Sequence, residues 1–300
     1  MMKMKKKMGI FWVLSLLFGF MLTGCSSGSA QAGSAPATMV IINKGSDTMI
    51  NLALAWAEAY QKLHSEIRIS VTGGGSGIGM AALGNHTVDI ANASREIKPE
   101  EKTKAEQNGA IPQEFVVARD AIAVIVNPHN PINQLTLQQI SLIYQGKINN
   151  WLELGGEDLP IVRLSRETNS GTHVYFLETV VRLGNSKDKS LFSPDTLLLP
   201  SSEGIITEVS SNPNAIGYDG LGYITPEVKT LAITVKNGGE AIMPSVETVN
   251  NKKYPVSRDL YMYTPGQPAG EVKRYLDWIH SSAAQQIVIN LGFVPIVTGQ

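Results

Sequence analysis

The stretch from Val162 to Phe176, reading VRLSRETNSGTHVYF, constrains the fold of this chain most strongly. A short β-branched run leads to Arg166, a polar loop follows, and an apolar-periodic run completes the stretch. This order predicts a strand, a tight loop and a helix start, with Ser170 and Thr172 as cap residues. Free N–H groups at a helix start attract anions, and an arginine fork suits a tetrahedral oxyanion. An ordinary cap beside a solvated arginine would read the same way, so similar loops elsewhere decide the interpretation.

A second strand–loop–helix unit begins near Met39, where we expect folded structure to start. Residues 39–42 are typical of a buried strand, and a helix is predicted to run through 52–63. The loop between them supplies three candidate cap residues, which are Ser46, Asp47 and Thr48.

A third unit follows directly. Residues 67–71 alternate as a strand, and the next loop holds four glycines around Ser76, which lets a backbone approach a ligand closely. The Walker lysine is missing and GGGSGIG lacks the dinucleotide spacing, so nucleotide binding is a weak interpretation.

Strand and helix patterns alternate along the rest of the chain, and we expect an α/β fold with largely parallel sheets. A strongly apolar strand is predicted from Phe115 to Val126, and it contains the charged pair Arg119-Asp120. No internal repeat is visible.

The N-terminus has the features of a secretory signal. Four lysines precede an apolar run from Met8 to Leu22 that is too short for a membrane span. The run ends in LTGC, which resembles the lipobox of bacterial lipoproteins, whose cysteine is lipidated and becomes the first mature residue. We therefore predict that residues 1–24 are a signal peptide, that Cys25 carries the lipid, and that residues 25–38 are a flexible linker. Cys25 is the sole cysteine, so no intrachain disulfide can form.

The charge balance restricts the class of partner. Loss of residues 1–24 removes four lysines and no acid, leaving 21 basic against 26 acidic residues, a net charge of −5. Nucleic acid and anionic lipid head groups are poor partners for such a surface. An anionic ligand would have to be held by local hydrogen bonds against the overall field.

Several segments together resemble the phosphate-binding lipoproteins of bacterial phosphate ABC transporters, the PstS family. These segments are KGSDTM (44–49), GGGSGIG (73–79), DIANASREIK (89–98), LTLQQISLIYQGKINNWLELGG (135–156), RETNSGTHVYF (166–176), NAIGYDGLGYI (214–224) and GFVP (292–295). Each motif is weak alone, but their order over essentially the whole mature chain is highly specific.

The resemblance implies a type II periplasmic-binding fold, with two α/β lobes, two crossing strands as a hinge, and the ligand in the cleft between the lobes. We place the crossings near Arg119 and Arg258. Residues 39–118 and 258–300 would then form one lobe, and residues 119–257 the other. A monomer that delivers phosphate to the permease subunits of an ABC transporter is expected, anchored by Cys25 to the extracytoplasmic face of the membrane.

The resemblance also implies the phosphate contacts, and these fall in the same three loops. They are Thr48, Met49, Ser76, Arg166, Ser170, Gly171 and Thr172, with Ser46 in the first loop added to the predicted site. Met49 can contribute only its backbone N–H.

One position departs from the family pattern. Some members place an aspartate, which accepts the proton of phosphate, where this chain has Ser94 followed by Arg95. Asp47 is our substitute acceptor, with Glu167 as the next candidate, and a plain helix cap is the alternative role for Asp47. Ser94 could still donate to the ligand, and Arg95 could pair with Asp47 or Glu167.

Two other functions compete with phosphate binding. Sulfate, molybdate or tungstate would suit the same class of site. A secreted serine hydrolase or phosphatase would use Ser170 as nucleophile and His173 as base, since residues three apart share a helix face. No G-x-S-x-G elbow surrounds Ser170, so we do not expect an enzyme. The five histidines show no ligand spacing, and neither metal nor cofactor is expected.

Overall fold

The computed structural model describes residues 39–296. The predicted signal peptide, the predicted lipidation site Cys25 and the predicted linker therefore lie outside the described residues. The strands are β1 (Met39–Gly45), β2 (Ile67–Thr72), β3 (Ile90–Ala93), β4 (Gln113–Val126), β5 (Gln134–Thr136), β6 (Val162–Arg166), β7 (Leu197–Leu199), β8 (Ala215–Gly220), β9 (Lys229–Thr230), β10 (Ala232–Thr234) and β11 (Ser257–Thr264).

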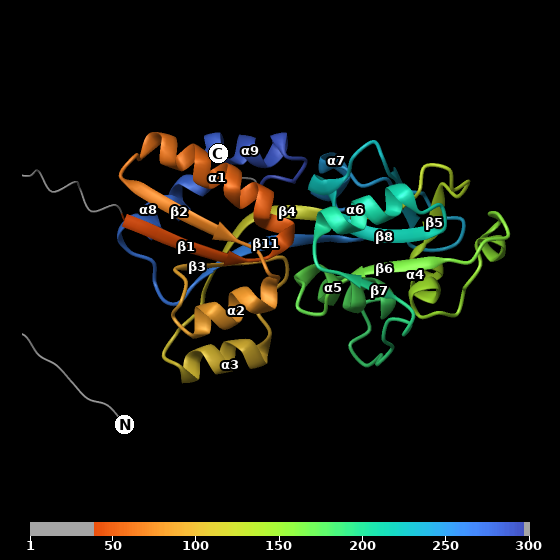
Figure 1. Ribbon diagram of the computed structural model, residues 1–300, viewed down its shortest axis with the longest axis horizontal. Helices are drawn as coiled ribbons and strands as arrows, with labels where there is room; N and C mark the ends of the chain where they lie inside the picture. The colour runs from red at the N-terminus through yellow and green to blue at the C-terminus, as the bar shows by residue number, and fades with distance from the viewer. Residues whose placement is uncertain (1–38, 297–300) are drawn as a thin grey trace, which may run out of the picture. The chain divides into compact units, whose positions relative to one another are not determined.

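Helices follow most of these strands, as the alternating pattern predicts (Figure 1). They are α1 (Ile50–Leu63), α2 (Ser76–Gly84), α3 (Pro99–Gln107), α4 (Leu137–Tyr144), α5 (Gly171–Phe176), α6 (Ser202–Ser211), α7 (Val246–Asn250), α8 (Gly270–Ile279) and α9 (Ser282–Asn290). Short helical turns are η1 (Asp47–Met49), η2 (Trp151–Leu154), the π-helical η3 (Leu177–Val181) and η4 (Leu221–Tyr223).

One sheet connects both halves of the fold, in the strand order β2-β1-β3-β11-β4-β8-β6-β7, and β9 pairs with β4. We call the elements around β2-β1-β3 the first lobe and the elements around β8-β6-β7 the second lobe. The predicted α/β class and the two-lobed fold are confirmed.

The strand directions are more mixed than the expected, largely parallel, arrangement. Within each lobe the neighbours are parallel: β1 pairs in parallel with β2 and β3, and β6 does so with β7 and β8. Both long strands, β4 and β11, run antiparallel to their neighbours. The sequence pattern of a buried strand does not reveal this direction, because both kinds of buried strand have a continuous apolar run.

Strand β4 belongs to both lobes. Its residues 113–121 pair with β11, and its residues 122–126 pair with β8. The predicted strand over 115–126 lies within β4. The charged pair Arg119-Asp120 sits just before the strand changes partner, and its register partners on β11 are Asp259 and Arg258.

Apolar helix faces cover the sheet of the first lobe. In α1 the buried positions Leu52, Ala53, Trp56, Ala57 and Tyr60 recur at helical spacing and form one stripe. The indole N–H of Trp56 donates to the carbonyl of α9 residue Ala284 at 2.9 Å, which ties α1 to the C-terminal segment. Figure 1 shows α1 and α9 on one face of the sheet and α2 and α3 on the other.

An aromatic cluster supports the start of α5 in the second lobe. Phe176 stacks on Tyr218 of β8, with ring centroids 3.6 Å apart, and Tyr144 meets both rings edge-on. The buried hydroxyl of Ser165 lies 2.6 Å from the Tyr218 hydroxyl and 3.0 Å from Nδ1 of His173. This packing holds the loop between β6 and α5 against the hydrophobic core of the second lobe.

Candidate oxyanion site between the lobes

The three predicted loops meet where the lobes face each other. The Gly77 amide donates to the Asn169 carbonyl at 3.0 Å, and the Asn169 side chain donates to the Gly74 carbonyl at 3.0 Å. The Gly75 amide donates to the Gly45 carbonyl at 2.9 Å, which joins the first and second loops. All three helix starts therefore open toward one small region.

The first loop does not cap its helix as expected. Ser46 precedes η1, but its side chain makes no capping hydrogen bond. The carboxylate of Asp47 instead turns to the other loops: Oδ1 accepts from the Gly74 amide at 2.8 Å, and Oδ2 accepts from Arg166 at 3.0 Å. The cap role considered for Asp47 is therefore wrong, because one carboxylate oxygen is bound by the second loop of the same lobe and the other by Arg166 across the cleft.

Two threonines meet across the cleft. The Thr48 and Thr172 hydroxyl oxygens lie 2.7 Å apart, although the residues are 124 positions apart in sequence. Both side chains are buried. Met49, beside Thr48, buries its side chain in the core, which leaves only its backbone for a ligand.

The second loop supplies Ser76 and the neighbouring strand end supplies Ser94. The Ser94 amide donates to Oγ of Ser76 at 3.1 Å, and the two hydroxyl oxygens are 3.4 Å apart. A Cβ at Gly171 would lie 2.4 Å from Oγ of Ser76 and 2.5 Å from Oγ of Ser94. These serines thus face the third loop at a distance that only glycine permits.

Ser170 caps α5 as predicted. Its Oγ accepts from the Thr172 amide at 3.2 Å. The π-helical turn η3 continues α5 directly, so the capped segment carries the apolar residues predicted after the loop.

Arg166 ends β6 and is fully enclosed. Nη1 donates to Oγ of Ser202 at 2.8 Å, and Nη2 donates to the Pro200 carbonyl at 2.8 Å as well as to Asp47. The buried carboxylate of Asp219 lies 3.7 Å from Nη1. The guanidinium is therefore held rigidly between the two lobes, with Asp47 as its partner from the first lobe.

The expected partners of Arg95 were wrong. Arg95 forms a bidentate pair with Glu101, at 2.8 and 2.6 Å, and also donates to the Glu96 carbonyl. Helix α3 begins with a capping box in which Glu101 turns back to the Lys98 amide at 3.0 Å. That local turn brings Glu101 next to Arg95, whereas Glu167 is exposed on the other lobe.

Three charged residues of the site were missed from the sequence. Arg258 donates through Nη2 to Asp120 at 3.1 Å and to the Thr172 hydroxyl at 2.9 Å, and Thr48 lies 3.4 Å away. Burial raises the pKa of Asp120 to about 6, although the neighbouring Arg258 opposes the shift. Burial likewise raises the pKa of Asp219, against the effect of Arg166. The sequence feature that could have indicated these residues is a charged side chain within an apolar strand, because a buried charge requires a partner.

The hydrolase dyad is not assembled in the described residues. Nδ1 of His173 contacts Ser165, and the ring packs on Phe192 with centroids 4.6 Å apart. Burial lowers the pKa of His173. Oγ of Ser170 accepts a hydrogen bond from the Thr172 amide. The imidazole of His173 instead supports the loop through its contacts with Ser165 and Phe192.

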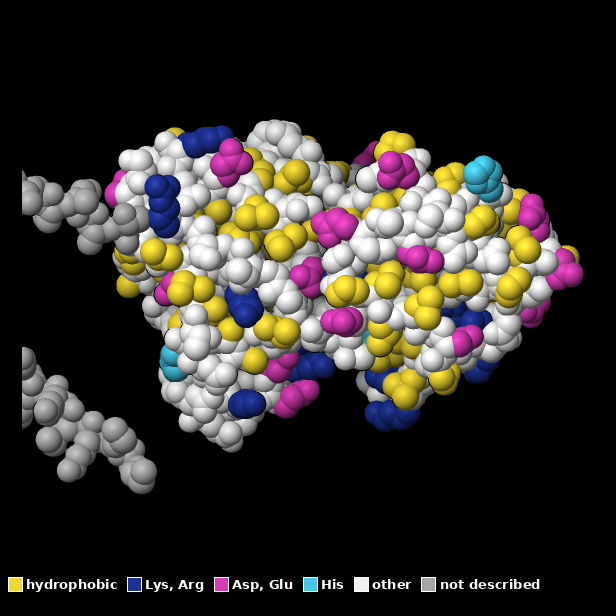
Figure 2. Space-filling model, viewed as in Figure 1, with side chains coloured by type: hydrophobic (Ala, Val, Ile, Leu, Met, Phe, Trp, Pro, Cys, Tyr) yellow, Lys and Arg dark blue, Asp and Glu magenta, His cyan; other side chains and the backbone are white. Residues whose placement is uncertain are grey.

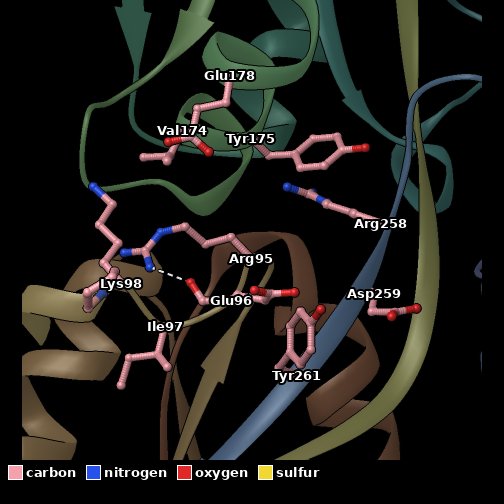
Figure 3. Close-up of a pocket in the computed structure, with 11 residues that line it drawn as sticks. Arg95, Glu96, Ile97, Lys98, Val174, Tyr175, Glu178, Arg258, Asp259 and Tyr261 are labelled. Atoms are coloured by element: carbon pink, nitrogen blue, oxygen red, sulfur yellow. Dashed lines mark hydrogen bonds between the residues drawn. The ribbon is translucent and has the colours of Figure 1, made fainter. Parts of the chain in front are cut away.

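A pocket of about 410 Å³ opens beside these loops, between α5 and the segment after β3 (Figure 3). It is lined by Arg95, Glu96, Ile97, Lys98, Pro99, Val174, Tyr175, Glu178, Arg258, Asp259 and Tyr261. Acidic and basic side chains are also interspersed over the face shown in Figure 2. Neither surface is a basic patch of the kind that binds nucleic acid.

Comparisons with known proteins identify the family. A PBP superfamily domain matches residues 30–283. The phosphate-binding protein PstS of Pseudomonas aeruginosa is 33% identical over 269 residues, which are 84% of this chain and 81% of that protein. The chain belongs to the PstS family. PstS of Bacillus subtilis is 27% identical over 98% of this chain and 95% of its own length.

A solved structure from Clostridium perfringens extends the likeness to three dimensions. That protein, described as a phosphate ABC transporter substrate-binding protein with bound phosphate, is 33% identical with a TM-score of 0.76. The match covers 86% of this chain and 99% of the other. The PstS family consists of substrate-binding transport proteins. None of the helices within residues 39–296 has the length and apolar character that a membrane span needs.

Proposed function

We propose that this protein captures inorganic phosphate outside the cytoplasm and delivers it to the permease subunits of an ABC transporter. The observation that carries the proposal is the convergence of three loops on one enclosed region in a chain of the PstS family. PstS of P. aeruginosa is named a phosphate-binding protein, and the C. perfringens structure holds phosphate.

The chemistry of the region suits a tetrahedral oxyanion. Hydroxyls of Thr48, Thr172, Ser76 and Ser94 are buried donors, and Arg166 supplies a charge from the end of β6. Donors fixed in a site that excludes water bind an anion well because no reorganisation is required. In our proposal Ser46, Asp47, Met49, Ser170, Gly171 and Arg95 complete or support the site.

Calorimetric titration with phosphate, followed by competition with sulfate, molybdate and tungstate, tests this function. Ser76→Ala and Thr172→Val should each weaken phosphate binding by about 1–2 kcal/mol, the scale of a single hydrogen bond. Arg166→Ala should cost several kcal/mol, with its melting temperature measured alongside because Asp47 and Asp219 lose their partner. Ser210→Ala, which removes an exposed hydroxyl of α6, is the matched control.

Phosphate affinity near wild type in Arg166→Ala would refute the site. Preference for sulfate or molybdate would be consistent with a site for a tetrahedral oxyanion but would reject phosphate as its ligand.

We further propose that the protein works as a monomer, tethered through a lipid on Cys25 with residues 25–38 as the linker. The LTGC motif after an apolar run supports the anchor. Cys25→Ser should release the protein from membranes while phosphate affinity stays unchanged. A variant that remains in the membrane fraction would exclude the lipidated cysteine as the anchor.

The lobes that we propose are residues 39–118 with 258–300, and residues 119–257. The change of partner along β4 and the pairing of β11 with β4 support crossings near Arg119 and Arg258.

A further inference from the structure

Arg258 occupies a position that the phosphate contacts of the family do not explain. It lies on β11, where the lobes join, and its side chain is 2% exposed. Nη2 has three oxygens within reach: Oδ2 of Asp120 at 3.1 Å, Oγ1 of Thr172 at 2.9 Å and Oγ1 of Thr48 at 3.4 Å. Thr48 belongs to the first lobe and Thr172 to the second, so Arg258 contacts a hydroxyl from each.

The guanidinium is held from two sides. Asp120 is fully buried, and its other oxygen accepts from the Leu221 amide at 3.0 Å. The ring of Tyr175 covers the guanidinium, with its centroid 5.5 Å from Cζ (Figure 3). Nε and Nη1 are buried and have no partner within the described residues. The burial of Arg258 is therefore not explained by contacts that satisfy all of its own hydrogen-bond donors.

The direction of the bonds has a chemical consequence. An arginine can only donate, so the Thr172 hydroxyl must accept from Nη2. The two threonine hydroxyls lie 2.7 Å apart, so one of them donates to the other. Two hydroxyls carry two protons, and one is used between them. The remaining proton cannot point to Arg258 and is left for an acceptor in the cleft.

We infer that Arg258 is a positioning residue for the bound oxyanion: it directs the free proton of the Thr48–Thr172 pair toward an unprotonated ligand oxygen. The inference rests on the proposed function. Because the two hydroxyls come from different lobes, this donor is set only when the lobes are together. Asp120 keeps Arg258 in place and balances its charge.

A double-mutant cycle separates this role from a merely structural one. Arg258→Gln is combined with Asp120→Asn, so that no buried charge is left unpaired. This pair of changes is made in the wild-type chain and in a chain with Thr48→Val and Thr172→Val. Phosphate affinity is measured by calorimetry and the melting temperature by circular dichroism.

We expect the charge-neutral pair to weaken phosphate binding about tenfold or more in the wild-type chain. In the chain lacking both hydroxyls we expect less than about a threefold further loss, because the group through which Arg258 acts is gone. In a chain with Thr172→Ser as its only other change, which keeps the hydroxyl, the charge-neutral pair should again cause most of the tenfold loss of phosphate affinity. An equal loss in both chains would overturn the inference.

The register provides a matched control. Arg119 and Asp259 are the neighbouring ion pair on the same two strands, at 3.2 Å, and both are more than one-third exposed. Arg119→Gln with Asp259→Asn should leave phosphate affinity within about twofold, since neither side chain contacts the threonines.

If the variant with Arg258→Gln and Asp120→Asn does not fold, Arg258→Lys is tested in its place. It keeps the charge beside Asp120 but loses the planar fork, so it should weaken binding while the melting temperature holds. Binding at wild-type strength would contradict the inference. If the wild-type protein binds sulfate or molybdate in place of phosphate, the proposed function fails and the same cycle with that anion still decides the role of Arg258. If it binds none of these anions, both proposals fail.

Discussion

Asp120 and Asp219 place two carboxylates in a part of the molecule that excludes water. Each faces an arginine of the site, Arg258 for Asp120 and Arg166 for Asp219. Taking a charge out of water is expensive, and a partner recovers that cost only when geometry is good. These pairs therefore fix the arginines at the cleft, at the expense of stability that a purely apolar core would have.

The raised pKa of Asp120 predicts a dependence of stability on pH. Its folded-state pKa is about 6, above the ordinary value of 3.8, so the folded protein holds this proton more tightly than the unfolded chain does. The stabilisation is fully present below the ordinary value and is lost as pH rises through about 6. Asp120→Asn does not titrate, so the unfolding free energy of wild type relative to this variant should fall by about 2 kcal/mol between pH 4 and 7.

Denaturant melts at several pH values measure that difference. Asp188 is the control of opposite sign, because hydrogen bonds from Ser190 lower its pKa. Wild type relative to Asp188→Asn should gain stability with rising pH. Parallel pH curves for wild type and Asp120→Asn would show that Asp120 does not titrate in this range.

Asp47 remains our predicted acceptor for the phosphate proton. Its two oxygens already accept from Gly74 and Arg166, but a carboxylate has about four lone-pair sites, which leaves room for a ligand O–H. Sulfate has no such proton and would present only lone pairs to the carboxylate. Asp47→Asn should therefore weaken phosphate about tenfold and admit sulfate, because an amide also donates.

Competition calorimetry at pH 7 with both anions checks the selectivity of Asp47→Asn. Glu167→Gln is the control, since Glu167 is exposed. Continued exclusion of sulfate by Asp47→Asn, with phosphate bound as before, would reject Asp47 as the acceptor.

At the level of elements, local signals predicted most of the fold. The strand–loop–helix units around Ser46, Ser76 and Ser170 follow from apolar periodicity and cap residues within about 15 positions, which a single sequence displays. The contacts that were missed or wrong are mostly long-range. Arg258 and Asp120 are 138 residues apart, and no local pattern pairs them. The partner of Arg95 failed differently, because the capping box of α3 outcompeted the expected distant carboxylates.

The third loop offers a test of how closely the elements must approach. Gly171→Ala would place a methyl group 2.4 Å from Oγ of Ser76, so the start of α5 could not reach the second loop without displacement. Overpacking of this kind costs about 1–3 kcal/mol, and we expect phosphate affinity to fall about tenfold or more. Gly266→Ala, at a glycine with open space around it, is the matched control for the calorimetry. Unchanged affinity in Gly171→Ala would mean that the loops do not need this contact.

For the whole molecule, the contacts between the lobes describe a closed arrangement. Asp47 meets Arg166, and Tyr223 of the second lobe donates to the Asp47 carbonyl at 2.7 Å. We expect these bonds to break when the ligand leaves, with rotation about the crossing segments of β4 and β11.

Small-angle scattering should therefore give a smaller radius of gyration with phosphate than without it. Arg166→Ala, which loses both ligand and interlobe contacts, should keep the larger value at the same phosphate concentration. Equal radii for the wild-type protein in both conditions would argue against hinge closure.

The position of β11 in the sheet also bears on the order in which the protein is made. β11, at residues 257–264, lies between β3 and β4 and pairs with both. During synthesis from the N-terminus, the first lobe lacks a central strand until nearly seven-eighths of the chain has emerged, and the edges of β3 and β4 stay unpaired. The sheet of the first lobe can therefore be completed only after β11 has been made, so we expect this lobe to reach its final form late in folding.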